Sequence, residues 1–139
     1  LAKWQEQEKR TAASTQYTQT YLGRRRYLPG IRSQDWSRKR FAEGCALNTP
    51  IQGTAADILK LALRRLLAGL PERPWLKPLL QIHDELVFEL PANRLDEAVA
   101  FIRLCMEQQP FPEFDVPIVA EAAYGADFGH MTEIERSNA

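Results

Sequence analysis

Three consecutive polar residues, His83, Asp84 and Glu85, interrupt the apolar stretch LLQIHDELVFEL at positions 79–90. Tight hairpin turns favour Gly, Asn-Gly or Asp-Gly, so the sequence His-Asp-Glu is poorly suited to forming one. Two adjacent carboxylates at the end of two buried strands make physical sense if a cation binds there, because Mg²⁺ takes carboxylate oxygens and leaves positions open for phosphate. Without further context, a solvated turn with incidental charge is the better interpretation of these three residues.

The C-terminal half is expected to build a small sheet around this tripeptide. Residues 79–90 predict two short strands, and PIVAEAAYG at 117–125 predicts another, followed by a polar tail from Ala126. Asn93 begins an amphipathic helix whose apolar face would consist of Leu95, Ala98, Val99, Ile102 and Met106. This order of elements predicts an α+β fold, with an antiparallel sheet and helices packed on one of its faces.

The N-terminal half is expected to begin with a helix and a hairpin. Residues 1–14 are polar and charged without Gly or Pro, which predicts the exposed end of a helix. Residues 17–29 alternate β-forming residues around Gly23, and Pro29 and Gly30 follow as turn residues. The pattern indicates a short β-hairpin.

Two further helices are expected before residue 70. Ser33 or Asp35 can cap a helix through SRKRFAEGCALN. Pro50 fits the first turn of a new helix, with Asn48 or Thr49 as its N-cap, because a first-turn proline loses no helical hydrogen bond. That helix would carry a buried leucine and isoleucine stripe.

The composition excludes several classes of protein. Apolar residues make up 45% and charged residues 26%, which is ordinary globular usage rather than disorder. The two cysteines, Cys45 and Cys105, fall inside predicted helices, which indicates buried thiols in a reducing compartment. No apolar run approaches the roughly 20 residues of a membrane span, so no membrane partner is expected. Because the chain opens at Leu1 rather than Met, we expect a piece of a longer protein.

The zero net charge hides two halves of opposite sign. Residues 1–69 carry 13 Lys or Arg against 5 Asp or Glu, whereas residues 70–139 carry 5 against 13. A basic half and an acidic half fit contact with a polyanion beside a carboxylate-rich region. Pairing of the two halves with each other is an equally good interpretation of the charge alone.

Three stretches, taken together, resemble the family A DNA polymerases. QIHDELVFEL resembles the motif in which a His-Asp-Glu turn tips a palm hairpin, LNTPIQGTAADILKLA (47–62) resembles the segment before it, and YLGRRRYLPGI (21–31) resembles a third. The three occur in the family's order and cover about residues 17–125. The resemblance implies that residues 1–139 are a single partial domain, the C-terminal palm portion of a DNA-directed DNA polymerase with a palm-type sheet.

The resemblance also implies the chemistry of the charged turn. Asp84 would be a metal-binding catalytic carboxylate supported by Glu85, in a two-Mg²⁺ site that transfers a deoxynucleotide to a primer 3′-hydroxyl under template direction. His83 would lie by the primer terminus, although a structural histidine within the turn is the alternative. Asn48 and Gln52 would contact the minor groove of the duplex, where amide donors sense base-pair geometry without reading sequence.

Six basic residues are expected to form a phosphate-facing patch: Arg24, Arg25, Arg26, Arg38, Lys39 and Arg40. One departure from the family is Gly44, at a position where the family usually has an arginine one helical turn before Asn48. A duplex contact is therefore expected to be missing, and either Arg40 or Lys39 compensates for it or primer–template binding is weaker. Asp57 is expected to be a structural hydrogen-bonding group. Primer–template DNA, deoxynucleoside triphosphates and the missing upstream polymerase segments are the expected partners, and the expected localisation is cytoplasmic and nucleoid-associated.

The chain is expected to hold only about half of the two-metal site. The family's other metal-binding aspartate and its nucleotide-gripping fingers helix would lie upstream of residue 1, so the isolated chain should be inactive. A non-catalytic remnant that binds DNA or a partner is the alternative function. An unrelated metal hydrolase using His83 and Asp84 is a weaker third, since it leaves NTPIQG unexplained. Exposed palm surface could also drive dimerisation.

Overall fold

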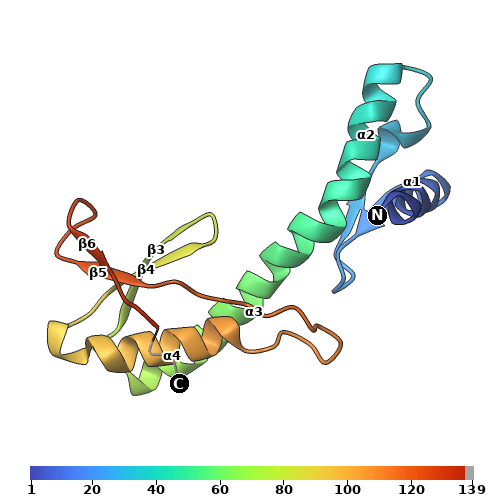
Figure 1. Ribbon diagram of the computed structural model, residues 1–139. Coiled ribbons are helices and arrows are strands. Elements are labelled where there is room, and N and C mark those ends of the chain that lie inside the picture. Colours follow the sequence, from blue (N-terminus) through green and yellow to red (C-terminus); the bar gives the residue numbers. More distant parts are fainter. Residues whose placement is uncertain (137–139) are drawn as a thin grey trace. The chain divides into compact units, whose positions relative to one another are not determined.

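The computed structural model describes residues 1–136 and has an α+β fold (Figure 1), as the sequence predicted. The chain divides into two compact units, Leu1–Ile58 and the part from Leu59 onward. The expectation of one continuous sheet is wrong for the described residues, because their six strands pair as three separate two-stranded antiparallel sheets. No helix in this part of the chain is both long and apolar enough to cross a membrane.

The first unit begins with helix α1, Ala2–Thr15, and a hairpin, which confirms both predictions. Strand β1, Tyr17–Gln19, pairs antiparallel with β2, Arg25–Tyr27. Gly23 lies in the loop between them with φ 85°, a backbone conformation that glycine adopts without steric cost. A short 3₁₀ turn, η1 at Pro29–Arg32, follows. The core of this unit consists of Ala12, Leu28, Ile31, Ala42, Cys45 and Ala46.

Helix α2, Trp36–Asn48, is capped by Asp35, whose Oδ1 accepts a hydrogen bond from the Arg38 amide at 3.1 Å. The helical path does not restart at Pro50, so the predicted N-cap role of Asn48 or Thr49 is wrong. Instead, α2 passes through one π-helical segment, η2 at Thr49–Gly53, into α3, Thr54–Gly69. Because proline lacks an N–H and crowds the preceding turn, the wider π turn accommodates it within a continuous helix.

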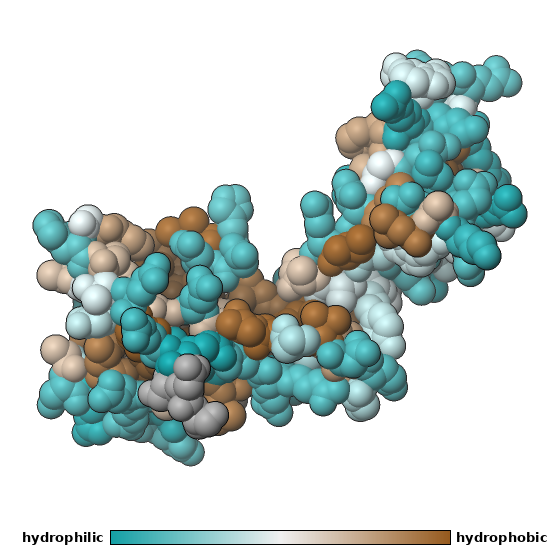
Figure 2. Space-filling model, viewed as in Figure 1, coloured by the Kyte–Doolittle hydropathy of each residue, from teal (hydrophilic) through white to brown (hydrophobic). Residues whose placement is uncertain are grey.

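The second unit holds a longer hairpin and an amphipathic helix. Strand β3, Lys77–Ile82, pairs antiparallel with β4, Glu85–Glu89, after the 3₁₀ turn η3, Leu70–Glu72. A further 3₁₀ turn, η4 at Ala92–Arg94, leads into α4, Leu95–Glu107. Buried apolar residues of this unit are Ala62, Leu66, Leu76, Ala98, Cys105 and Ala120. Figure 2 shows that apolar side chains also reach the molecular surface.

The predicted strand at 117–125 is mostly absent. Only Ala123–Gly125 forms a strand, β5, and it pairs with β6, Met131–Glu133, which lies in the expected polar tail. Side chains of α4 instead bind the backbone just before β5. Glu107 Oε1 accepts a hydrogen bond from the Ala120 amide at 2.8 Å, and Arg103 Nε donates one to the Ala120 carbonyl at 3.3 Å. These side-chain hydrogen bonds replace those that a partner strand would supply.

Candidate functional site

The His83-Asp84 turn joins β3 to β4. Ile82 pairs directly with Glu85, so Glu85 already belongs to β4 and the connection has two residues rather than the predicted three. His83 has φ 56°, and the first central position of a type II′ hairpin turn requires a positive φ. Gln81 Nε2 donates to the His83 carbonyl at 3.3 Å within the same turn. A histidine in this backbone region carries strain that a glycine would not.

The carboxylates of Asp84 in this turn and of Glu85 beside it are exposed, and within residues 1–136 neither forms an ion pair or accepts a hydrogen bond. Their oxygens are therefore free to bind a cation. In the same part of the chain, no group of three or more His, Cys, Asp or Glu side chains could hold a metal ion. Asp84 and Glu85 fit a Mg²⁺ site as hard oxygen donors, but they supply only part of its coordination shell.

A second candidate surface lies on the continuous helix around the π segment, where the hairpin β1–β2 supports it. Thr18 is 5% exposed, and its Oγ1 donates to the Ala46 carbonyl at 3.2 Å. In a regular α-helix, that oxygen would accept from the amide of residue 50. Because Pro50 has no amide hydrogen, the hydroxyl of Thr18 provides a donor that the helix lacks.

Further contacts from the hairpin reach the end of the π segment. The Tyr21 amide donates to Thr54 Oγ1 at 2.9 Å, and that hydroxyl donates in turn to the Pro50 carbonyl. Arg24 Nη2 donates to the Gly53 carbonyl at 3.1 Å. A Cβ on Gly53 would lie 2.6 Å from Thr20 Cγ2, so the hairpin packs against the helix closely enough to require glycine there.

Asn48 and Gln52 lie on this supported stretch and are exposed. The backbone is helical on both sides of Thr49, so residues four apart share one helix face, as predicted. Among the described residues, neither side chain forms a hydrogen bond, which leaves both amides available to a ligand. Their predicted contact with a DNA minor groove stays a prediction.

The six basic residues of the predicted patch differ in what they contact. Arg24 Nε pairs with Asp57 Oδ1 at 2.8 Å, and Asp57 is 7% exposed, as expected of a structural group. Arg25 lies over the Tyr17 ring at 4.5 Å, and Arg40 lies over the Trp36 ring at 4.9 Å.

Arg26, Arg38 and Lys39 differ from the other three, because their side chains have neither an acidic or hydrogen-bonding partner nor a ring contact in the part of the chain that the structure describes. These three are the members of the patch most available to phosphate.

The π segment and the Arg24–Asp57 pair were missed from the sequence. A π turn differs from an α turn by about one residue and here lasts only from Thr49 to Gly53, which is too short for apolar periodicity to reveal. The signal that could have found it is Pro50 itself, placed inside a stretch whose helical pattern continues on both sides. The ion pair joins residues 33 apart in the sequence, and no local pattern encodes it.

Comparison with known proteins identifies the class of protein. The family model described as DNA polymerase family A matches residues 1–130. The chain is 41% identical over 130 residues to a thermostable DNA polymerase I of Thermus filiformis, covering 90% of this chain and 15% of that protein. It is 43% identical over 111 residues to DNA polymerase I of Bacillus caldotenax, covering 79% of this chain and 12% of that protein.

A solved structure is similar as well. The POL domain of Pol1 from M. smegmatis, in complex with DNA primer-template and dNTP, superposes with a TM-score of 0.76 at 38% identity, covering 84% of this chain and 20% of that one. The fold and the matched sequence thus define part of a DNA polymerase. The chain belongs to DNA polymerase family A. It spans about 15% of the length of the Thermus filiformis relative.

Proposed function

We propose that this chain is the palm portion, carrying the His83-Asp84 turn, of a DNA-directed DNA polymerase that adds deoxynucleotides to a primer 3′-hydroxyl under template direction. The observation that carries the proposal is the match of residues 1–130 to DNA polymerase family A. The solved Pol1 domain that resembles this chain was complexed with primer-template DNA and dNTP, which supports the same partners here.

Asp84, supported by Glu85, is the residue of this chain that would hold Mg²⁺ in the complete polymerase. Both are exposed and their oxygens are unpaired within residues 1–136, so binding a cation breaks no existing interaction. When bound, two such ions would lower the pKa of the primer hydroxyl and stabilise the departing pyrophosphate. The short turn holds Asp84 at the tip of β3 and β4, where a carboxylate can reach a ligand without displacing the strands.

Primer–template DNA would lie along the exposed amides of the continuous helix. Asn48 and Gln52 present donors from one face, and the hairpin contacts of Thr18 and Arg24 hold the backbone beneath them. Amide donors on a rigid helix can contact the minor-groove acceptors that every base pair presents. His83, beside Asp84, would contact the sugar-phosphate backbone at the primer end.

Further segments of the parent polymerase would pack on the β3–β4 hairpin. Leu79, Leu80 and Ile82 of β3 are 53%, 55% and 41% exposed, although their side chains are apolar. Burying them would gain free energy in proportion to the area removed from water. In the isolated chain the same surface could pair two copies, and sedimentation velocity over a range of concentrations would measure that.

A non-catalytic, DNA-binding remnant is the second candidate, and Gly44 is the observation that favours it. The family usually has an arginine at this position, whereas the glycine supplies neither a side chain nor a charge to contact DNA. Only the catalytic candidate adds nucleotides to a primer. Extension of a labelled primer in the presence of Mg²⁺ and deoxynucleoside triphosphates therefore distinguishes the two. We expect the 139-residue chain to bind primer–template without extending it, and the parent polymerase to extend it.

The decisive variant is Asp84→Ala in the parent polymerase. We expect the rate of primer extension to fall at least about 1,000-fold, because the Asp84 carboxylate would hold Mg²⁺ that stabilises the transition state. The thermal midpoint of unfolding should not change. Asp115→Ala removes another exposed carboxylate, one that forms no ion pair within residues 1–136, and should leave extension unaltered. Near-normal turnover by Asp84→Ala would exclude Asp84 as a metal ligand, and Mg²⁺-dependent extension by the isolated chain would show that its site is complete.

A further inference from the structure

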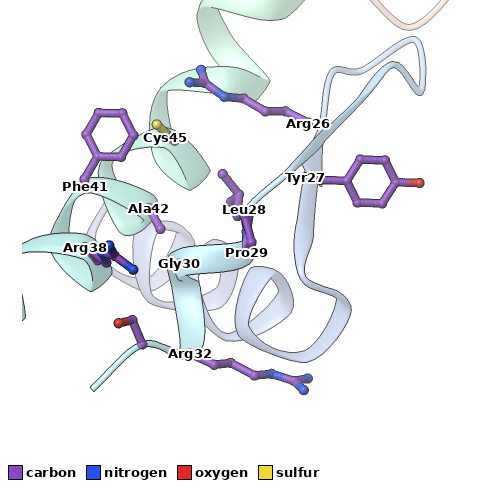
Figure 3. Close-up of a pocket in the computed structure, with 11 residues that line it drawn as sticks. Arg26, Tyr27, Leu28, Pro29, Gly30, Arg32, Arg38, Phe41, Ala42 and Cys45 are labelled. Carbon is purple, nitrogen blue, oxygen red and sulfur yellow. The ribbon is translucent and has the colours of Figure 1, made fainter. Parts of the chain in front are cut away.

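An open hollow of about 500 Å³ lies in the first unit, lined by residues of β2, η1 and α2 (Figure 3). Its volume is in the range of sites that bind small molecules. Leu28, Ala42 and Cys45 contribute buried apolar surface to it, with exposed fractions of 4%, 3% and 8%. Asn48, Gln52, His83, Asp84 and Glu85 do not line this hollow, whereas Arg26 and Arg38 of the predicted phosphate-facing patch do.

Polar and aromatic groups approach the hollow from two elements. Figure 3 shows Arg26 extending over it from the hairpin, with Arg38 and Phe41 approaching from α2, whereas the Tyr27 ring points away. Phe41 is 71% exposed, which is unusual for a phenylalanine beside a hydrophobic core. An aromatic ring at the edge of an apolar hollow offers a flat face to a planar ligand.

The charge of the hollow is entirely positive. Its lining contains Arg26, Arg32 and Arg38 and no Asp or Glu. Arg32 is occupied, because its Nε and Nη2 donate to the carbonyls of Ala13 and Ser14 at 2.6 and 2.7 Å. The Arg26 and Arg38 side chains have no such partner among residues 1–136, so their donors are available to an anion.

We propose that this hollow binds one unpaired nucleotide of a DNA single strand, with the base against Phe41 and its phosphate between Arg26 and Arg38. The proposal rests on the proposed DNA-binding function and adds a single-strand site to it. A basic groove with an aromatic stacking face is the usual chemistry for single strands, whose bases are free to stack on protein. Bases inside a duplex are already stacked and cannot enter such a hollow.

The test compares the affinity of the 139-residue chain for fluorescent dT12 and for a blunt duplex, measured by anisotropy. Phe41→Ala should weaken dT12 binding about five-fold or more, because base–aromatic stacking is lost, and change duplex binding less than about two-fold. Phe41→Trp should retain dT12 binding. The double variant Arg26→Gln/Arg38→Gln should weaken dT12 binding and reduce its salt dependence.

Lys60→Gln/Arg64→Gln is the matched control, since it removes two exposed charges that do not line the hollow. It should affect dT12 less than the Arg26/Arg38 double variant. Thermal midpoints of all variants, followed by circular dichroism, exclude unfolding as the cause. The proposal is overturned if Phe41→Ala leaves dT12 binding unchanged, if it weakens duplex and dT12 equally, or if free dTTP binds as tightly as dT12.

Failure of the proposed function gives a different result. If the wild-type chain binds neither dT12 nor duplex, DNA binding by the chain is itself excluded. If it binds duplex and primer–template normally but dT12 independently of Phe41, only the single-strand site is excluded.

Discussion

Thr18 Oγ1 lies 3.2 Å from the Ala46 carbonyl oxygen and donates to it from a β-strand, at the position where Pro50 deprives a helix of its own donor. The contact joins residues 28 apart in the sequence and is buried. It explains how a proline is tolerated in the middle of a continuous helical path. The exposed amides of Asn48 and Gln52 therefore depend on the hairpin for their support.

Thr18→Val should lower the free energy of unfolding by about 1–2 kcal/mol, because a buried carbonyl loses a donor while the side-chain volume is kept. In a Pro50→Ala background, residue 50 regains its amide, so the same substitution should cost less. Urea denaturation of the four proteins of this double-mutant cycle measures the coupling. Thr18→Ser, which keeps the hydroxyl, is the control; equal costs in both backgrounds would show that the two residues are independent.

Gly53→Ala should destabilise the first unit by about 1–3 kcal/mol, because the new Cβ would lie 2.6 Å from Thr20 Cγ2 in a buried contact. A Thr20→Ser background removes that methyl and should reduce the cost. Gly44→Ala is the opposite case, since its Cβ meets nothing within 4 Å in a helix and should stabilise by about 0.5–1 kcal/mol. Thermal unfolding ranks the variants, and a Gly53→Ala protein as stable as wild type would rule out the clash.

Local signals explain which elements could be predicted from the sequence. The Asp35 cap, the turn at Gly23 and the amphipathic pattern of α4 each act within a few residues, so their positions followed from composition and spacing. The two predicted strands at 79–90 likewise match β3 and β4. Family resemblance, rather than any of these patterns, pointed to Asp84 and Asn48.

Interactions between distant residues explain what could not be predicted. Residues 117–122 have a strand-like composition, but Glu107 and Arg103 of α4 bind the backbone at Ala120 and prevent strand pairing. Likewise, the hydroxyl of Thr18 permits the helix to continue through Pro50. In both cases a side chain far away in sequence satisfies a backbone group, and no window of local sequence contains that information.

Gly44→Arg tests the departure from the family directly. Position 44 is four residues before Asn48 on the same helix face, and its surroundings leave room for a side chain. Gly44→Arg and Gly44→Ala should both stabilise α2. Only the arginine should tighten primer–template binding, and it should increase the magnitude of the slope of log affinity against log salt concentration by about 1. Anisotropy titrations at several salt concentrations measure this, and equal affinities for the two variants would mean that position 44 does not face DNA.

Burial raises the pKa of the Cys105 thiol, and the nearby charges of Arg65 and Arg73 oppose that shift only in part. The folded state therefore keeps its proton at pH values where the unfolded thiol, with a pKa of about 8.5, has lost it. The contribution of the Cys105 thiol to the free energy of unfolding is therefore fully present below about pH 8.5 and declines as the pH rises above that value. Urea unfolding between pH 7 and 10 should show the difference between wild type and Cys105→Ala shrinking, whereas a constant difference would contradict the linkage.

His83→Gly should separate the strain of the hairpin turn from its proposed role beside DNA. Glycine adopts φ 56° without a Cβ penalty, so the β3–β4 hairpin should become more stable by up to about 1 kcal/mol. Hydrogen exchange of the β3 and β4 amides measures that local gain. The affinity of His83→Gly for primer–template should fall, because the imidazole is lost. His83→Asn also tolerates a positive φ. It should lose the same affinity, but the hydrogen-exchange rates of the β3 and β4 amides should change less than in His83→Gly. If His83→Gly tightened DNA binding, the strained histidine would have to be structural only.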